Sequence, residues 1–380
     1  EGGGVQGGLV PAARFREACL GCGFQATTDF HQGALVADNG ELEASWEYST
    51  VPLAGWGKGL DPAAASQAAT QAATKDTNYA GTKEEAVAAR AGAGNEEAEG
   101  ARKWRRPVAG EATQRSLAGW LARFPVFEPH WQVTMAHGLA SGRLTWRGQT
   151  VEFQNAPAYA EKNWGGSFPL KWYWVQCNAF AGEPWLSVTA GGGRRLLPGL
   201  GGLTEDLGMV GIHHRGKFYE MAPWMGSSGW DVASWGNWTL KAKSKTHECE
   251  LVATLDPLLD PGTVVRAPTD EFGLAPFLRD SMRASCRLDL WALCPATGRR
   301  LQPAVIAGAE SNQCGVEVGG GPWWDGLTWS QPESQMRQPF KFLVQAPYRL
   351  DALRRRLRGL RGLRRRGGKV RAEEPTEGGA

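Results

Sequence analysis

The sequence lacks several features that would assign it quickly to a class. No apolar run approaches the ~18–20 residues of a membrane-spanning helix. No G-x-S-x-G nucleophile elbow is present, so a serine hydrolase has no support. The Gly191–Gly193 run lacks the Lys-Ser/Thr of a P-loop and the spacing of a dinucleotide fingerprint. This run is instead predicted to form a tight turn after a strand at Trp185–Ala190.

Cysteine is sparse and irregularly placed. The seven cysteines have scattered spacings, and Cys19 and Cys22 form a lone C-x-x-C with no second pair and no suitably placed histidine. This pattern favours inert thiols in a reducing compartment, and it predicts neither a metal site nor a redox site. The first residue is Glu1, and no targeting peptide is visible.

Tryptophan and glycine are abundant, at 18 and 51 of 380 residues. Together with short alternating runs, they favour β-structure with aromatic-lined interiors. The net charge of +3 is unevenly placed, because residues 349–371 hold ten Arg and one Lys against one Asp. Leucines at helical spacing predict a basic amphipathic helix over 348–366. Docking on an anionic lipid surface is one interpretation; a solvated tail or a nucleic-acid-attracting patch is the other.

The chain is predicted to divide into β domains with irregular flanks. Residues 1–13 are expected to be disordered, and 61–116 are expected to form a low-complexity insertion without stable order, apart from a transient helix at 86–93. One β domain would comprise 14–60 and 117–153, and a second 154–347, with Pro157 marking a break. The basic helix and a disordered end would fill 348–380. Further strands are predicted at Ala44–Val51, His130–Ala136, Met209–His214, Lys217–Met221, Trp238–Ala242, Glu248–Thr254, Cys286–Leu293 and Gly315–Val318.

The most informative stretch is 155–180, which ends in a predicted strand. One face of this strand would carry two indoles and then two amides, Trp172, Trp174, Gln176 and Asn178. The other face would carry Tyr173, Val175, Cys177 and Ala179. The first face suits a pocket better than a plain core, because buried amides need hydrogen-bond partners.

Several long motifs resemble the tocopherol cyclase family, in that family's order. They are GFQATTDFHQG at 23–33, WEYSTVPLAGWG at 46–57, FEPHWQ at 127–132, EKNWGGSFPLKWYWVQCN at 161–178, GGGRRLLPGL at 191–200, RAPTDEFGLA at 266–275 and VEVGGGPWW at 316–324. The resemblance implies a mainly β fold of two lipocalin-like antiparallel β-barrels side by side. Members of that family carry a further segment, with a tryptophan-bearing strand, ahead of the motif that stands here at 23–33. That segment is expected to be missing from this sequence, which would leave the first barrel incomplete.

The resemblance implies a plastid enzyme of vitamin E biosynthesis, an isomerase of the intramolecular lyase type. Such an enzyme protonates the prenyl double bond of a methylated phytyl or geranylgeranyl benzoquinol, and the phenol oxygen captures the cation to close a chromanol ring. No cofactor, no metal and no nucleic acid is expected. The expected partners are the prenyl-benzoquinol and the surface of a plastoglobule or inner plastid membrane, with the prenyl tail in the barrel interior and at its rim.

This chemistry needs a desolvated carboxylic acid and aromatic faces that stabilise a cation. Glu161 is the predicted acid, with Tyr159 and Asn163 positioning it; the alternative is a Glu161 that pairs with Lys162 or Lys171. Further candidates lie elsewhere in the chain. The predicted cation and substrate contacts are Trp131, Trp164, Trp172, Trp174, Gln176, Asn178, Trp46 and Trp323. His130 or His31 would handle the phenol, with Glu128 beside His130, and Glu317 is a rival acid.

Two other functions remain open on the sequence alone. The same acid and aromatic residues would serve a hydratase that adds water to a prenyl or carotenoid alkene. A non-catalytic carrier of prenyl lipids would need only the apolar interior.

Overall fold

The computed structural model describes residues 23–26, 30–36, 42–79, 114–117, 130–164, 168–197, 203–269 and 273–321. All of them belong to the unit Glu1–Gln335; the second unit, Met336–Ala380, lies outside the described residues, as does the predicted basic helix. The described chain is mainly β, and every strand pair in it is antiparallel, which confirms the predicted fold class. None of the described helices is long and apolar enough to cross a bilayer.

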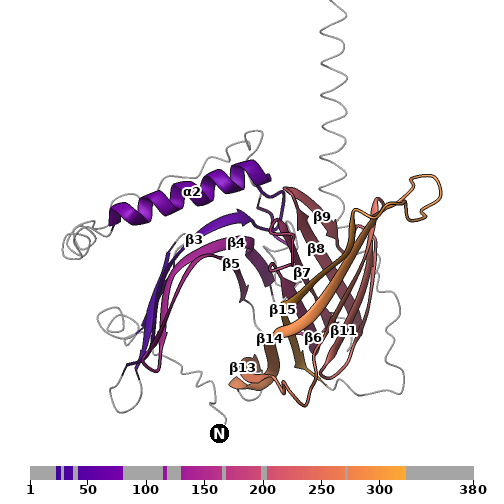
Figure 1. Ribbon diagram of the computed structural model, residues 1–380. Helices are drawn as coiled ribbons and strands as arrows, with labels where there is room; N and C mark the ends of the chain where they lie inside the picture. Colours follow the sequence, from indigo (N-terminus) through magenta and orange to yellow (C-terminus); the bar gives the residue numbers. More distant parts are fainter. Residues whose placement is uncertain are drawn as a thin grey trace, which may run out of the picture. The chain divides into compact units, whose positions relative to one another are not determined.

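Sheet A contains five strands in the order of the sequence (Figure 1). They are β1 (Gly23–Ala26), β2 (Phe30–Val36), β3 (Leu42–Ala54), β4 (His130–Trp146) and β5 (Gln149–Trp164). The pairing of β4 with β5 shifts register at three places, between Val133 and Met135, between Met135 and Gly138, and between Ala140 and Gly142. Bulges bend strands and increase their twist, which accounts for the strong curvature of this sheet in Figure 1.

Sheet B contains ten strands, with the order β10-β11-β12-β14-β15-β6-β7-β8-β9 and β13 paired to β14. The first five along the chain are β6 (Lys171–Cys177), β7 (Leu186–Leu196), β8 (Thr204–His214), β9 (Lys217–Met221) and β10 (Ser227–Val232). The others are β11 (Asn237–Lys243), β12 (His247–Thr254), β13 (Thr263–Thr269), β14 (Gly273–Ala292) and β15 (Ile306–Gly320). Each strand predicted from Trp185 onwards lies within one of these strands or extends at most one residue beyond it. Strands β10 and β13 were not predicted.

One face of sheet B encloses the main hydrophobic core. Alternate residues of every long strand enter it, such as Tyr173, Val175 and Cys177 of β6, and they pack with Trp238, which is fully buried. The sheet curls so that β10 approaches β8, where Ser228 Oγ donates a hydrogen bond to a backbone oxygen at 2.7 Å. Among the described residues no ladder joins β9 to β10 and no ladder closes sheet A, so barrel closure is not confirmed for either of the two predicted lipocalin-like barrels, of which the first was expected to be incomplete.

Strand β5 runs without interruption through Pro157, so the predicted break at this proline is wrong. Pro157 pairs in register with Leu139 of β4, and β5 is the edge strand of sheet A. Proline is tolerated on an edge strand, because its missing N–H leaves no neighbouring strand without a donor. The predicted domain boundary near Gln154 therefore falls inside a strand.

An α-helix, α2 (Pro62–Tyr79), occupies the start of the segment that was expected to lack order. Asp61 caps it, because its Oδ1 accepts a hydrogen bond from the backbone N–H of Ala64 at 2.9 Å. Pro62 occupies the first helical position, where its missing N–H costs nothing, and the following alanines favour helix. The transient helix expected at 86–93 lies outside the described residues.

Candidate functional site

The outer face of sheet B, opposite its core, packs against sheet A. Trp172, Trp174, Gln176 and Asn178 share this face, as their alternation predicts, and none of them belongs to the core of sheet B. Asn178 Nδ2 donates a hydrogen bond to the carbonyl oxygen of Ala158 in β5 at 2.8 Å. The Trp174 ring lies 5.6 Å from the Tyr159 ring. The described site is therefore between the sheets.

Glu161 of β5 is held at this junction by two donors. Trp131 of β4 donates its indole N–H to Oε2 of Glu161 at 2.6 Å, and the Tyr159 hydroxyl donates a short hydrogen bond to the same oxygen. Trp174 in turn approaches the Tyr159 hydroxyl, with its Nε1 at 3.5 Å. Burial raises the pKa of Glu161, and the hydrogen bonds from Tyr159, Trp131, Trp174 and Asn163 oppose that rise only in part. Glu161 makes no ion pair with a described lysine.

Glu317 of β15 is a second carboxyl on the same outer face. It pairs directly with Trp174 of β6 on one side and with Asp280 of β14 on the other, and the indole N–H of Trp172 donates a hydrogen bond to its Oε1. Burial raises the pKa of Glu317 to about 7, and the charges of Glu161 and Asp280 add to this rise. The two glutamates therefore interact electrostatically.

The Gly191–Gly193 run lies in the middle of β7, so the predicted turn is wrong. The three glycines pair with Trp174, Tyr173 and Trp172. A Cβ on Gly191 would lie 2.8 Å from the Trp131 ring, and one on Gly192 would lie 2.7 Å from the Tyr173 hydroxyl. Glycine here allows the close approach of aromatic rings.

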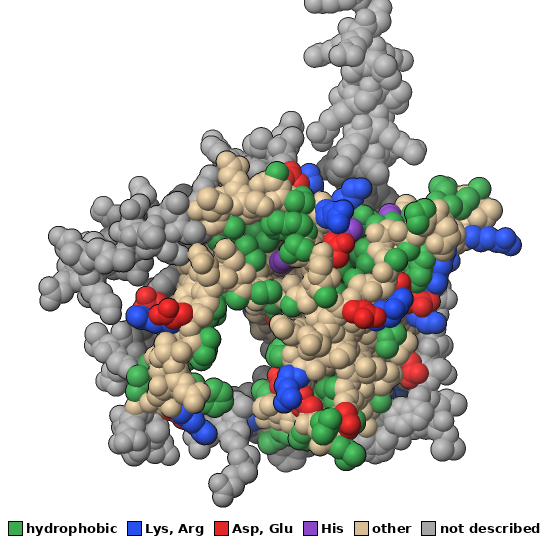
Figure 2. Space-filling view, viewed as in Figure 1, with side chains coloured by type: hydrophobic (Ala, Val, Ile, Leu, Met, Phe, Trp, Pro, Cys, Tyr) green, Lys and Arg blue, Asp and Glu red, His purple; other side chains and the backbone are tan. Residues whose placement is uncertain are grey.

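A groove of about 380 Å³ lies along sheet A and leads to Tyr159. Its walls come from β2 to β5, and most of the lining side chains are apolar: Met135, Ala140, Phe153, Ala156, Pro157, Ala158 and Ala160, with His31, Tyr48 and Thr50. His31 stacks on Tyr48 with ring centroids 4.9 Å apart, and burial lowers the pKa of His31. Figure 2 shows hydrophobic side chains along the hollow between the two sheets.

The structure does not bring His130 and Trp164 to Glu161. They pair with each other across β4 and β5 and stack at 5.0 Å, with Lys162 Nζ 4.8 Å from the Trp164 ring. Successive residues of a strand point to opposite faces, so Trp164 and His130 lie on the face of sheet A opposite Glu161. Proximity in sequence was misleading for both residues.

The remaining predicted residues differ in their placement. Trp46 lies across from Gly33 in sheet A, on the same side of β3 as Tyr48 of the groove. Gln176 is buried beside Trp174, and its Nε2 has no hydrogen-bond partner among the described residues. Glu128 and Trp323 lie outside the described residues.

Sequence reasoning missed two residues that build the site, Trp56 and Glu220. Trp56 is fully buried, contacts the Trp131 and Phe218 rings, and donates its indole N–H to Glu220 Oε1 at 2.9 Å. Arg115 donates to the other oxygen of Glu220 at 2.7 Å. Trp56 lies in a quoted motif, but nothing in the sequence indicates its partner on β9.

Fold and site together define a mainly β protein that holds two interacting carboxyl groups among tryptophans, at the end of an apolar groove. A family model described as tocopherol cyclase-like matches residues 90–320. The chain belongs to this family.

Two curated plant proteins match over 84% of the chain. A probable chloroplastic tocopherol cyclase of Oryza sativa subsp. japonica is 40% identical over 327 residues, and a chloroplastic tocopherol cyclase of Zea mays is 39% identical. The matches cover 57% and 56% of these two proteins, so the chain spans little more than half of their length. Among solved structures, kievitone hydratase from Nectria haematococca aligns with a TM-score of 0.30 and 13% identity, over 53% of this chain and 56% of that one.

Proposed function

We propose that the protein is a tocopherol cyclase, which converts a methylated phytyl or geranylgeranyl benzoquinol to a chromanol. The observation that carries the proposal is the half-buried Glu161, held by Trp131 and Tyr159 between two sheets, in a member of the tocopherol cyclase-like family. The reaction is an isomerisation, because the proton added to the alkene carbon is balanced by the proton lost from the phenol oxygen. It requires a strong acid, an aromatic site and the exclusion of water.

Glu161 is the proposed proton donor. Both of its short contacts, from Trp131 and Tyr159, end on Oε2, which leaves Oε1 to carry the acidic proton. Burial favours the protonated carboxyl, which is the form that a general acid needs. Protonation of the trisubstituted alkene then gives a tertiary cation, and the phenol oxygen attacks that carbon while its own proton passes to a carboxylate.

Aromatic rings supply the surroundings that such a cation needs. Trp174, Tyr159 and Trp131 lie around Glu161, and a desolvated cation over an aromatic face gains ~2 kcal/mol. Because water would capture the cation as an alcohol, the packing of the two sheets is part of the chemistry. His130 and Trp164 have no place in this proposal, because they lie on the other face of sheet A.

The groove of sheet A is the proposed site for the prenyl tail. It is apolar, its volume is in the range of small-molecule pockets, and it leads to Tyr159. The core of sheet B is filled by its own side chains, so it does not suit the tail as the barrel interior was expected to do. His31 and Tyr48 would contact the substrate, and Gln176 offers an amide N–H to a quinol oxygen.

Glu317 is the alternative acid, because its pKa of about 7 keeps a large fraction protonated at neutral pH. It accepts one tryptophan donor, whereas Glu161 accepts several that favour ionisation. A pair in which one carboxyl donates and the other accepts a proton is consistent with the effect of the Glu161 charge on the pKa of Glu317.

Vitamin E biosynthesis in the chloroplast is the proposed setting, since both curated relatives are named chloroplastic tocopherol cyclases. Contact with a plastoglobule or an inner plastid membrane is part of the proposal. It is supported by the ten arginines of residues 349–371.

The decisive experiment is an incubation in heavy water. The protein would receive a dimethyl-phytyl-benzoquinol, and products would be analysed by mass spectrometry. A chromanol with one carbon-bound deuterium is expected, because the added proton comes from an exchangeable carboxyl. Glu161→Gln should lower turnover at least 100-fold. Glu152→Gln is the matched control, since Glu152 is an exposed glutamate of the same strand, and it should keep full activity.

Other products would identify the rival functions. A tertiary alcohol would make the protein a prenyl-alkene hydratase. Unchanged substrate that stays bound to the protein would identify a carrier and would exclude the catalytic roles of Glu161 and Glu317.

A further inference from the structure

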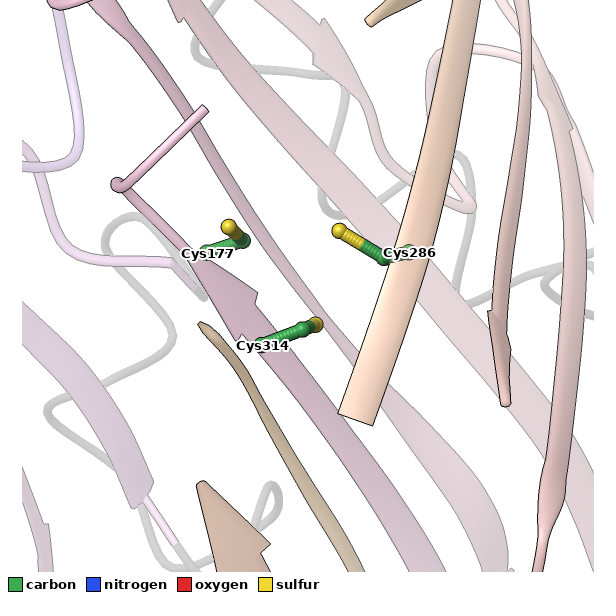
Figure 3. A group of neighbouring side chains, drawn as sticks. All are labelled: Cys177, Cys286 and Cys314. Carbon is green, nitrogen blue, oxygen red and sulfur yellow. The ribbon is translucent and has the colours of Figure 1, made fainter. Parts of the chain in front are cut away.

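Three cysteines converge in the core of sheet B, away from the carboxyl site. Cys177 lies on β6, Cys286 on β14 and Cys314 on β15, which are neighbouring strands in the order β14-β15-β6. All three are buried, and their Sγ atoms lie within 4.8 Å of one another. Figure 3 shows the three side chains directed into a common space.

Strand register accounts for this convergence. Gly315 of β15 pairs with Gln176 of β6, so the next positions along the two strands bring Cys314 and Cys177 side by side. The pairing of β14 with β15 shifts register between Ala284 and Cys286. Register shifts re-aim side chains, and this one directs Cys286 toward the other two thiols.

The donor set is three sulfurs and nothing else. Among the described residues no histidine or carboxylate joins the group. Zinc in structural sites almost always takes four ligands, whereas thiolates also select the softer Cu(I) ion. A three-coordinate ion with bonds of ~2.3 Å to sulfur needs sulfurs ~4 Å apart, which small side-chain rotations from the present spacing provide.

The surroundings of the three thiols offer no charged partner among the described core residues. The neighbours of the three thiols in the core are apolar, and burying uncompensated charge is costly. Binding displaces the thiol protons, because the thiolate and not the thiol is the ligand, and the bound ion offsets part of the negative charge that the thiolates would otherwise hold in this apolar core. A disulfide would use only two of the three sulfurs, and the burial of all three restricts access by oxidants.

We propose that Cys177, Cys286 and Cys314 form a binding site for a single Cu(I) ion. The ion would join three neighbouring strands of sheet B from the core side. On β6, Trp174 lies three residues from Cys177 and on the opposite face. On β15, Glu317 lies three residues from Cys314 and on the opposite face. The same two strands therefore carry the carboxyl site. This proposal does not depend on the proposed function.

The test is an anaerobic titration of the reduced full chain with Cu(I) against a chromogenic Cu(I) chelator. Cys19, Cys22 and Cys294 would be replaced by Ser in every sample, because other thiols also bind copper. One tightly bound ion per chain is expected, with three sulfur neighbours by X-ray absorption spectroscopy. The midpoint of thermal unfolding should rise on loading, because the ion binds only the folded site.

Matched variants separate this site from general thiol binding. Cys286→Ser and, independently, Cys177→Ser should each weaken Cu(I) binding at least tenfold. Cys249→Ser should bind as the parent does, since Cys249 is a fully buried cysteine of the same core outside the group. Circular dichroism would verify that each variant is folded.

Several results would overturn the proposal. One is that the folded parent chain takes up no tightly bound Cu(I), and another is that Cys286→Ser and the parent bind Cu(I) with equal affinity. The site would also differ from the proposal if it bound four-coordinate Zn²⁺ and had no affinity for Cu(I). A disulfide between two of these cysteines in the freshly purified protein would also count against it.

Discussion

Glu161 and Glu317 come from different sheets, yet their charges interact. If Glu161 is the acid, turnover should fall as pH rises through its pKa, because the protonated form is lost. Glu317→Gln should leave this fall at the same pH, because Glu317 is not among the groups that shift the pKa of Glu161, and a substantial rate should remain at low pH. A pH–rate profile of the parent and the variant tests this expectation. Loss of activity at every pH in Glu317→Gln would assign the acid role to Glu317.

Glu317 also makes folding stability depend on pH. Its pKa rises from an ordinary 4.5 to about 7 on folding, so the folded state binds its proton more tightly than the unfolded state. Ionisation of Glu317 therefore lowers the free energy of unfolding. This loss is absent below pH 4.5, grows between pH 4.5 and 7, and is complete above pH 7, where it amounts to ~3 kcal/mol. Urea unfolding at several pH values should show this loss in the parent and not in Glu317→Gln. Parallel curves for the two proteins would contradict it.

Gly191 leaves room for the Trp131 ring, so Gly191→Ala should destabilise the protein by ~1–3 kcal/mol through overpacking. The variant should also lose turnover, because Trp131 donates to Glu161. Adding Trp131→Phe should restore stability, since the smaller ring frees space, but not turnover, since phenylalanine has no N–H. A double-mutant cycle of unfolding free energies measures the coupling, and additive effects would show that the two residues do not compete for this space.

At the scale of elements, a β-bulge in β5 bends the strand where it pairs with β4. Two residues of β5, Gln154 and Asn155, face one of β4 between the pairs Gly142–Phe153 and Ala140–Ala156. Asn155 has a φ of 52°, and its backbone N–H donates to Ser141 Oγ at 2.9 Å. Asn155→Val should cost ~1–2 kcal/mol, because a β-branched residue is strained in this conformation, whereas Asn155→Gly should cost little. Urea unfolding of both variants tests this expectation, and equal losses would locate the cost in the asparagine side chain.

The same elements show how far sequence reasoning reaches. The two faces of β6 follow from simple alternation, and β9 occupies its predicted bounds, Lys217–Met221. Alternation does not say what each face contacts; the tryptophan face was predicted to line a pocket, and its residues Trp174 and Asn178 contact β5. The turn predicted at Gly191–Gly193 was wrong because glycine also serves close packing. The break predicted at Pro157 was wrong because edge position depends on the tertiary fold.

At the scale of the molecule, the carboxyl site exists only where sheet A packs on sheet B. Glu220 of β9 joins the sheets, since it accepts hydrogen bonds from Trp56 and Arg115, and its side chain is only 7% exposed. Glu220→Ala would leave the buried indole N–H of Trp56 without its partner. The expected cost is ~2–3 kcal/mol, because hydrogen bonds to charged groups are stronger than neutral ones and a buried donor is lost from pairing. Turnover should fall as well, since Trp56 packs on Trp131.

Glu310→Ala is the matched control for this change. Glu310 pairs with Arg287 on sheet B, but its side chain is 67% exposed, and exposed ion pairs contribute at most ~1 kcal/mol. Hydrogen exchange of β4 and β5 amides should accelerate in Glu220→Ala and stay unchanged in Glu310→Ala, because only the first loosens the contact between the sheets. If both variants retained parental exchange and turnover, the sheets would be held together without Glu220. The direct contacts between the sheets, of Asn178 with Ala158 and of Trp174 with Tyr159, would then be what keeps Glu161 between them.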